Sequence, residues 1–463
     1  MFTKRLFYLV FFALVVFSTT GIVSAAAEES VVSSEVILYD EMVDTLQILE
    51  ERSDGDLEVI NLREFGNEGG VSEAGRDLYV AKIGNGDKDI WVQGRIHGNE
   101  PYGTNGTLRI IENLIEEKDS SYEEMMEELT IHFIPMYNPD GAERNERGTR
   151  ILDPETGVFG PQQDLNRDWH EDRFNMVETA SYFEYWASIQ PEFTMDVHHH
   201  GTPNFHESDI PVTMSLGIAL APGGPTLPYL TNGEEYETVA KQANVLMYDA
   251  LEAYPQFTVD HYRVGQNRTG EIDHRGGISS GAMRGEHINY NGHNPDGHSN
   301  PGVFLETAGQ FLDGEREPLI KQNIVALHAF LYGLASGELY DQDPDRFYGE
   351  IPHPPLESYT TDWDGTFPVD NPRPALYLET SAADVKELFE YYDEAGKFEN
   401  DQVARSLDVH LSAVNHYEQN EQMDKFLKHM PGLNLLLDQQ SEFMTDVTYS
   451  TLTAYTDYLI EQN

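Results

Sequence analysis

His97 and Glu100 have the residue types and the spacing of a metal site. They lie three residues apart, soon after the apolar run 90–92, which predicts a buried strand. Two side chains at the end of a strand can turn toward one point, and zinc accepts imidazole nitrogen and carboxylate oxygen at about 2 Å. A surface turn with two polar residues is the alternative for this pair alone. A third ligand and a base must therefore come from elsewhere in the chain.

His198 offers the third ligand. It is the first of three consecutive histidines that follow the strand-like run 193–197. Successive side chains of a strand point to opposite faces, so His198 shares a face with Asp196, and His199 faces the other way. A local metal site made of all three histidines is the competing interpretation, but neighbours on one strand cannot all reach one ion. Two histidines and one carboxylate would leave one zinc position open for water.

Glu306 is the candidate general base. It follows the apolar run 303–305, at what we expect to be another strand end. Partial burial there would raise the pKa of the carboxyl group, which suits a base that activates water. Asp164 and Asp196 are candidates to fix the histidine tautomers by hydrogen bonds. From spacing alone, surface carboxylates are an equal alternative for these two aspartates.

Arg150, Asn166 and Arg167 offer positive and hydrogen-bonding groups between these segments. A guanidinium grips a carboxylate by two parallel hydrogen bonds and can stabilise a developing oxyanion. Taken singly, each of the three residues also fits a surface salt bridge or hydrogen bond. Their role therefore depends on what the fold brings beside them.

The elements that must position these residues alternate between strands and helices. This alternation predicts an α/β domain with a largely buried sheet and with its polar site at the strand ends. We expect strands at 57–62, 77–83, 89–96, 131–136, 193–197 and 302–305, and helices at 40–52, 176–188, 234–253 and 318–335.

The remainder of the chain changes character after residue 340. Residues 341–378 contain seven prolines and are predicted to be a Pro-rich linker or an extended segment that lies over the domain. Residues 379–463 show four apolar stripes at helical spacing, which predict a small helical bundle. The predicted domains are a signal peptide at 1–26, a catalytic domain at 35–340, the linker and the bundle.

The composition excludes one class of partner and constrains the metal chemistry. The 463 residues contain 29 Lys and Arg against 81 Asp and Glu, a formal net charge of −52. A basic footprint for nucleic acid is therefore missing. Because the acidic residues are spread along the chain, we expect a solvated acidic surface of the kind suited to a salty environment rather than an acidic binding tail. Cysteine is absent, so any metal must be held by His, Asp and Glu.

The first residues predict secretion. Lys4 and Arg5 precede the apolar run 6–17, and the small residues 24–27 offer cleavage sites. The apolar run is short for a membrane span, although an uncleaved anchor is the alternative. No later run is long enough to cross a bilayer. We therefore expect an extracellular protein without a membrane span.

Five motifs together resemble the zinc carboxypeptidases of the M14 (carboxypeptidase A-like) family. In the family's order, they are H-G-N-E at 97–100, N-P-D-G at 138–141, D-L-N-R-D-W at 164–169, M-D-V-H at 195–198 and F-L-E-T-A-G at 304–309. The resemblance implies an α/β/α domain around a mixed sheet of about eight strands. It implies one Zn²⁺ per chain, and it gives the ligand roles to His97, Glu100 and His198.

The same resemblance implies the remaining roles. Glu306 would be the base and proton shuttle, and Arg150 would polarise the scissile carbonyl. Asn166 and Arg167 would hold the terminal carboxylate of a peptide substrate, and Asp164 would orient His97. The family's substrate-capping tyrosine has no clear counterpart, since Tyr262 and Tyr290 are merely nearby in the sequence.

The C-terminal region resembles the FIMAH module of extracellular proteins. The matching segments are S-L-D-V-H-L-S-A-V at 406–414, K-H-M at 428–430, L-L-L-D at 435–438 and Y-L-I at 458–460. This resemblance implies an accessory module, with cell-wall association as one possible role.

These observations predict a secreted zinc metallocarboxypeptidase that hydrolyses the C-terminal bond of peptides. A peptidase acting on peptidoglycan stem peptides and an amidohydrolase on the same scaffold are the rival enzymes. A wall-binding protein that has lost catalysis is the non-enzymatic alternative, although the retained Glu306 speaks against it.

Overall fold

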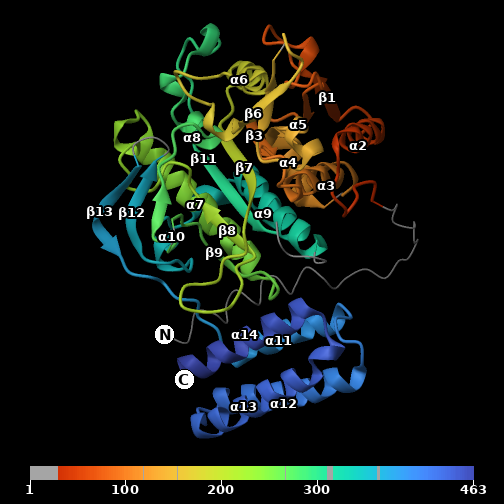
Figure 1. Cartoon of the computed structure of the whole chain (residues 1–463), viewed down its shortest axis with the longest axis vertical. Coiled ribbons are helices and arrows are strands. Elements are labelled where there is room, and N and C mark those ends of the chain that lie inside the picture. Colours follow the sequence, from red (N-terminus) through yellow and green to blue (C-terminus); the bar gives the residue numbers. More distant parts are fainter. Residues whose placement is uncertain (1–29, 118, 154, 266, 310–315, 362–364) are drawn as a thin grey trace. The chain divides into compact units, whose positions relative to one another are not determined.

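The computed structural model describes residues 30–463 except 118, 154, 266, 310–315 and 362–364 (Figure 1). The predicted signal peptide at 1–26 lies outside the described residues. No helix within the described ranges is both long enough and apolar enough to cross a membrane.

An eight-stranded mixed sheet forms the centre of the first part of the chain (Figure 1). Four parallel strands, in the order β4-β3-β7-β11, lie in its middle, and antiparallel pairing joins β2 to β4 and β8 to β11. In sheet order the strands are β1 (Leu57–Asn61), β2 (Tyr79–Ile83), β4 (Leu129–Ile134), β3 (Lys88–Gly94), β7 (Phe193–His200), β11 (Gly302–Ala308), β8 (Met214–Gly217) and β9 (Val259–His261). The predicted mixed sheet of about eight strands is confirmed.

Helices cover both faces of this sheet, and β7 shows how the faces divide. The ring of Phe193 packs on Phe330 in α9 (Arg316–Ser336), and His199 stacks on Tyr102 in α3 (Tyr102–Glu116). The opposite face, which carries Trp91, packs against α6 (Val177–Ile189) and α8 (Ile278–Met283) in one buried cluster. Alternate side chains of a strand point to opposite faces, so the layers are α/β/α. The helices α2 (Tyr39–Arg52), α4 (Ser120–Glu128), α5 (Pro139–Arg144) and α7 (Gly233–Glu252) complete this region.

Two regions contain more structure than the sequence predicted. The stretch 201–301, expected to be mostly loop outside one helix, supplies β8, β9, β10 (Gly270–Ile272) and α8. These strands are only three or four residues long, too short to show a period of two in the sequence.

Residues 341–378, predicted to be a linker, contain α10 (Arg346–Gly349), β12 (Leu356–Thr361) and β13 (Gly365–Arg373). β12 pairs in parallel with β10, and Phe347 and Ile351 are fully buried. Much of this stretch is therefore folded onto the preceding region. Its prolines lie in β13, which is an edge strand, and in the turns, where the missing N–H is tolerated.

A two-stranded ribbon is separate from both sheets. It consists of β5 (Thr149–Leu152) and β6 (Phe159–Gln163), which pair antiparallel. The turn between them is closed by the Asp153 carboxylate, which accepts the N–H groups of Glu155 and Thr156 at 2.8 and 3.1 Å.

Four helices form the C-terminal region, as predicted: α11 (Ala382–Glu394), α12 (Asp401–Gln419), α13 (Met423–Gln440) and α14 (Asp446–Gln462). Ser381 and Asp384 form a capping box at the start of α11. All four predicted apolar stripes are buried, with Leu388, Leu407, Met430 and Leu452 among their members.

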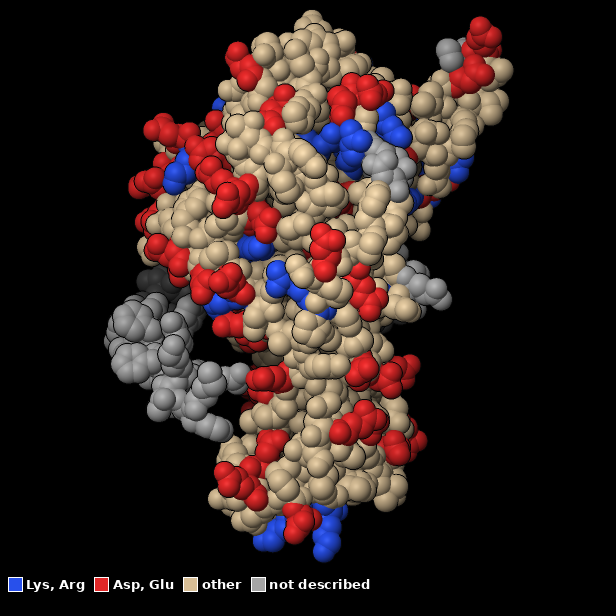
Figure 2. Space-filling model, turned by 90° about the vertical axis from the view of Figure 1, so that its left-hand side faces the viewer, with Lys and Arg blue, Asp and Glu red and all other residues tan. Residues whose placement is uncertain are grey.

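Acidic side chains are spread widely over the face shown in Figure 2, whereas Lys and Arg gather in a few places. The distribution agrees with the even spread of Asp and Glu along the sequence.

Candidate metal centre and catalytic groups

The loop that carries His97 and Glu100 is held in place by close backbone contacts. A Cβ on Gly98 would lie 2.0 Å from the carbonyl carbon of Gly141, so only glycine fits against the turn that begins α5. The buried Arg95 has a positive φ of 58° and donates from Nε to the Gly98 carbonyl at 2.9 Å. These contacts turn the chain sharply after β3 and present His97 at the end of the strand.

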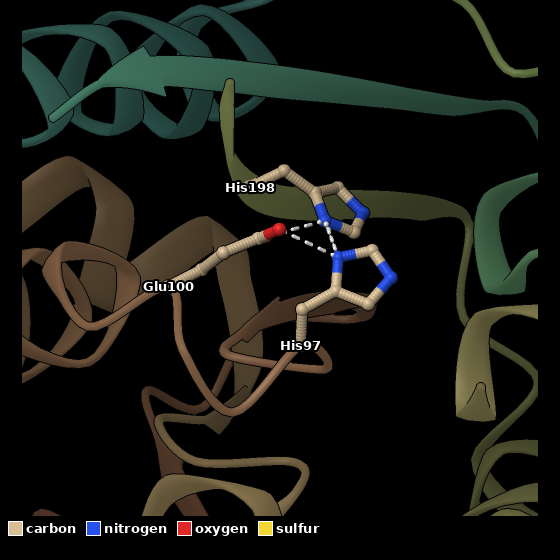
Figure 3. Close-up of side chains that lie close together, drawn as sticks. All are labelled: His97, Glu100 and His198. Carbon is tan, nitrogen blue, oxygen red and sulfur yellow. Dashed lines mark hydrogen bonds and ion pairs between the residues drawn. The ribbon is translucent and has the colours of Figure 1, made fainter. Parts of the chain in front are cut away.

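His97, Glu100 and His198 converge, although they come from segments about one hundred residues apart (Figure 3). The Glu100 carboxylate lies 2.8 Å from His97 Nδ1 through Oε1 and 3.1 Å from His198 Nδ1 through Oε2. The two Nδ1 atoms are 3.2 Å apart. All three residues are almost fully buried.

This arrangement fits a zinc ion. Ligand atoms about 2.0–2.1 Å from a tetrahedral zinc lie about 3.3 Å from one another, close to the three spacings above. Two neutral imidazole nitrogens that face each other with lone pairs repel, and a shared cation removes that repulsion. The donor set of two imidazoles and one carboxylate is also that of a catalytic site with an open position.

The far nitrogens of both histidines meet carboxylates. His198 Nε2 lies 2.7 Å from Asp196 Oδ2, and His97 Nε2 lies 3.3 Å from Asp164 Oδ1. Burial would raise the pKa of the Asp164 carboxyl, but His97 and nearby arginines hold it well below its usual range. Asp164 is therefore a carboxylate that can keep the imidazole of His97 oriented.

Glu306 stands beside His198 because the two residues are register partners on the parallel strands β11 and β7. The side chain is 8% exposed. Burial, with the charge of Glu100, raises the pKa of Glu306 to about 7, against the opposing effect of both ligand histidines. The strand continues to Ala308, so Glu306 lies inside β11 rather than after its end as we expected. The apolar run ends early because Glu306 is polar, while the backbone pairing continues.

Asn166 and Arg167 lie on a short 3₁₀ turn, Leu165–Arg167, next to His198. Asn166 Nδ2 is 3.3 Å from His198 Nε2, while its Oδ1 accepts the Ile278 N–H at 2.9 Å. Arg167 donates from Nη1 to the Asn166 carbonyl at 2.7 Å. The turn packs against Gly276, where a Cβ would lie 2.6 Å from the Arg167 carbonyl oxygen.

Arg150 does not take part in this cluster of contacts. Its Nε and Nη2 each lie 2.6 Å from a carboxylate oxygen of Glu146, and its Nη1 donates to the Gly160 carbonyl at 3.1 Å. The structure therefore corrects the sequence-based prediction for Arg150, because its guanidinium holds the ribbon together at its root.

Arg147 is the arginine that reaches the cluster, and sequence reasoning missed it. Its Nη1 lies 3.6 Å from Glu100 Oε1, and its Nε donates to Asp164 Oδ2 at 3.0 Å. Its carbonyl accepts the Gly98 N–H at 3.0 Å, which ties it to the loop of His97. The run R-G-T-R at 147–150 holds two arginines, and sequence spacing alone did not separate them.

Of the two tyrosines noted in the sequence, Tyr262 lies near the cluster. Its ring meets Phe304 edge-on with centroids 5.1 Å apart, and Phe304 in turn lies edge-on to His198 at 6.4 Å. Burial, with the charges of Glu306 and Glu100, raises the pKa of the Tyr262 hydroxyl well above its usual value. Tyr290 instead stacks on Phe174 at 4.7 Å.

A second group of possible ligands, His170, Glu171 and Asp172, does not form a comparable site. His170 Nδ1 accepts the Asp172 N–H at 2.8 Å, and Glu171 pairs with Arg275 and Arg284 at 2.8 and 3.1 Å. The arginines already supply the positive charge that a metal would bring.

Comparison with known proteins gives matches to two families. Residues 67–196 match the zinc carboxypeptidase family (Peptidase M14), and residues 382–461 match the FIMAH domain. Both resemblances expected from the sequence are thereby confirmed.

Parts of three curated carboxypeptidases are similar to parts of this chain. Carboxypeptidase D of Homo sapiens is 29% identical over 174 residues, which are 32% of this chain and 12% of that protein. Carboxypeptidase 2 of Trichophyton tonsurans is 28% identical over 109 residues, 24% of this chain and 18% of that protein. Zinc carboxypeptidase of Simulium vittatum is 26% identical over 147 residues, 26% of this chain and 48% of that protein. The matches thus span less than half the length of these relatives.

Among solved structures, carboxypeptidase A from Helicoverpa armigera matches with a TM-score of 0.48 at 15% identity, covering 68% of this chain and 77% of that chain. Thrombin activatable fibrinolysis inhibitor matches with a TM-score of 0.48 at 14% identity, covering 66% of this chain and 77% of that chain.

Proposed function

We propose that this chain, whose residues 67–196 match the zinc carboxypeptidase family, is a secreted zinc metallocarboxypeptidase that removes the last residue of peptides. The observation that carries the proposal joins residues inside and outside the matched region. His198 and Glu306 are outside residues 67–196, yet strand register sets them beside each other and beside the ligands inside it. A complete ligand set with a base next to it is what hydrolysis of a peptide bond requires.

His97, Glu100 and His198 would hold one zinc ion through two Nδ1 atoms and a carboxylate. Such an ion supplies a Lewis acid and lowers the pKa of bound water to near neutrality. Asp196 accepts from His198 Nε2, and the Asp164 carboxylate lies 3.3 Å from His97 Nε2, so both carboxylates favour rings oriented with Nδ1 toward the centre.

Glu306 is the proton carrier. As a carboxylate it takes a proton from the attacking water, and as a carboxylic acid it gives that proton to the leaving amine. Its burial keeps the two forms close in free energy near neutral pH, because the pKa is raised to about 7. Arg147 can donate to the scissile carbonyl oxygen as negative charge develops on it, since its guanidinium lies beside Glu100.

Asn166 and Arg167 would hold the terminal carboxylate of the substrate. The Asn166 amide adjoins His198, so a carboxylate bound there lies about one residue from the bond at the metal centre. A guanidinium and an amide together supply donors to both carboxylate oxygens. This grip favours a carboxypeptidase over an amidohydrolase acting on substrates without that carboxylate.

The setting of this activity follows from the chain outside the catalytic part. The basic start, apolar run and small residues of 1–26 support export. The net charge of −52 supports activity at high salt concentration. The FIMAH match supports attachment to an extracellular surface such as the cell wall.

The test is a mass-spectrometric ladder on a mixed pool of linear peptides, in high salt, with and without a zinc chelator. Stepwise loss of C-terminal residues that the chelator stops and added zinc restores is the expected result. A folded, zinc-loaded protein that produces no ladder would refute the proposal. Purified wall fragments and N-acylated amino acids are then the substrates that separate the rival enzymes.

A further inference from the structure

The β5–β6 ribbon exposes apolar side chains to solvent. Ile151, Leu152, Val158 and Phe159 are all exposed, Val158 to 63%. Contiguous apolar residues at the surface of a soluble protein mark a binding surface more often than scattered ones do. Leu152 and Phe159 are register partners, and Ile151 and Val158 adjoin them in the sequence.

In the described part of the chain β5 and β6 pair with each other in a sheet of two strands. The Leu152 N–H of β5 already donates to the Glu73 carboxylate, and Pro161 in β6 has no N–H to offer. An extended peptide would therefore meet the ribbon mainly through side-chain contacts.

The ribbon starts and ends at residues of the candidate centre. Arg147, which contacts Glu100 and Asp164, precedes β5 by two residues, and Asp164 directly follows β6. The Gly148 N–H donates to the Gln162 side chain at 3.1 Å between the two strands. Whatever lies along the ribbon is thus continuous with the centre.

Hydrogen bonds hold the described residues of the ribbon together. Arg150 joins its strands by donating to Gly160, and Thr149 donates from its hydroxyl to the buried Glu178 at 3.0 Å. Asp153 closes the turn, and its N–H donates to the Val158 carbonyl at 3.0 Å. A formed ribbon loses little conformational freedom when a ligand adds to it.

We propose that the β5–β6 ribbon binds the segment of a peptide substrate upstream of the scissile bond and prefers apolar side chains there. This inference rests on the proposed function. A peptide whose last residue is held at Asn166 and Arg167 must leave the centre through its upstream residues. The ribbon extends roughly 14 Å from its root, at about 3.4 Å per residue, which corresponds to about four substrate residues. The acidic turn, with Asp153 and Glu155, disfavours acidic residues at the far end of that segment.

The experiment compares two series of peptides that share their last two residues. One series carries Leu or Val at the third to fifth positions upstream of the scissile bond. The other series carries Ser at the same positions. We expect the apolar series to have a kcat/KM roughly tenfold higher with the unaltered chain, as burial of one or two apolar side chains gives. A blocked dipeptide, too short to reach the ribbon, serves as the reference substrate.

The test variant is the double substitution Val158→Ser with Ile151→Ser, both at exposed positions. It should bring the ratio between the series close to one and leave the blocked dipeptide unchanged. Val409→Ser is the matched control, because Val409 is 67% exposed and lies in α12, outside the ribbon. The control should keep the full ratio.

Two results would overturn the inference. The unaltered chain could treat both series alike, or the double variant could keep the preference. In the second case, an altered sedimentation of the variant would assign the ribbon to contact with a second copy. If peptides of every length are left intact, the proposed function itself fails. Cleavage of the blocked dipeptide keeps the two failures distinguishable.

Discussion

The carboxylate of Glu306 and the imidazole of His198 stand side by side because their residues are register partners on β11 and β7. Neighbouring strands lie about 4.8 Å apart, and both side chains leave the same face of the sheet. The proposed base therefore lies beside a proposed metal ligand because two backbones pair, and a single side-chain substitution leaves that pairing intact. Substitution of Glu306 and substitution of His198 can therefore have different effects, the first on turnover and the second on metal binding.

We expect Glu306→Gln to keep the metal and lose turnover. Glutamine has nearly the shape of glutamate but cannot take the proton of water, so kcat should fall by about 10²- to 10⁴-fold. Zinc content measured by atomic emission should stay at one per chain. Undiminished hydrolysis by this variant would remove Glu306 from the mechanism.

The pH dependence of kcat/KM should show an acid limb that belongs to Glu306. The base works only as the carboxylate, so activity rises as pH increases through its pKa, which burial raises to about 7. A bound dication favours the carboxylate, so the limb should fall at or below about pH 7. Rates in low-chloride buffers across the range test this, and a rate that falls as pH increases from 5 to 7 would contradict it.

Asp196→Asn should weaken zinc binding without removing a ligand. Asp196 Oδ2 lies 2.7 Å from His198 Nε2, and loss of such a partner typically lowers metal affinity about 10- to 100-fold. Competition with a chromogenic chelator measures the change. His97→Ala, which deletes a ligand, should lower zinc occupancy further, and full occupancy in that variant would contradict the assignment.

Arg147→Ala and Arg150→Ala form a matched pair three residues apart. Arg147 contacts Glu100, so its removal should lower kcat by about 10²- to 10³-fold, as loss of an oxyanion donor does. Arg150 pairs with Glu146 at the surface and should change activity by no more than about threefold. The opposite ranking would restore the assignment that the sequence suggested.

We expect Glu178 to make the free energy of unfolding depend on pH. It is fully buried beneath the ribbon, and burial raises the pKa of its carboxyl from 4.5 to about 8. A raised folded-state pKa means that the contribution to stability is complete below the unfolded value and is lost as pH rises through the folded one. Stability should therefore decline between about pH 4.5 and 8 by at most ~1.4 kcal/mol per pH unit from this group.

Glu178→Gln isolates that contribution, because it is neutral at every pH. The difference in free energy of unfolding between the variant and the unaltered chain should grow from pH 5 to about 8 and then level off. Denaturant titrations at several pH values measure it, and a difference that stays constant would show that Glu178 is ionised throughout.

Salt should stabilise the folded chain. With a formal net charge of −52, repulsion between carboxylates disfavours the compact state, and salt screens it. The midpoint of thermal unfolding should rise between about 0.1 and 2 M KCl, more than it does with a nonionic osmolyte of equal osmolality. Equal stability and activity at both salt concentrations would contradict this expectation.

The sequence was sufficient to identify the long elements and the candidate residues that the fold brings together. His97, Glu100, His198 and Glu306 were recognised because each follows an apolar run, and the same runs became the central strands. The four helical stripes were recognised because their period is long enough to repeat several times.

The features that the sequence did not predict depend on tertiary contacts. Nothing in R-G-T-R shows that Arg147 faces Glu100 and that Arg150 pairs with Glu146. For residues 341–378 the prolines left a linker and an extended segment over the domain as alternatives, and the pairing of β12 with β10 favours the second. Pairing partners of short strands are set by the whole fold and not by local periodicity.

His199, the neighbour of His198, joins strand β7 to the start of helix α3. Burial lowers the pKa of His199 to about 3, so its neutral ring accepts the Tyr102 N–H at 2.9 Å, two residues after Glu100. The strand that carries His198 is thus fastened to the start of α3, two residues after Glu100. If these residues hold zinc as proposed, folding alone would bring the donor atoms together, and we expect the affinity to depend mainly on competition between protons and metal.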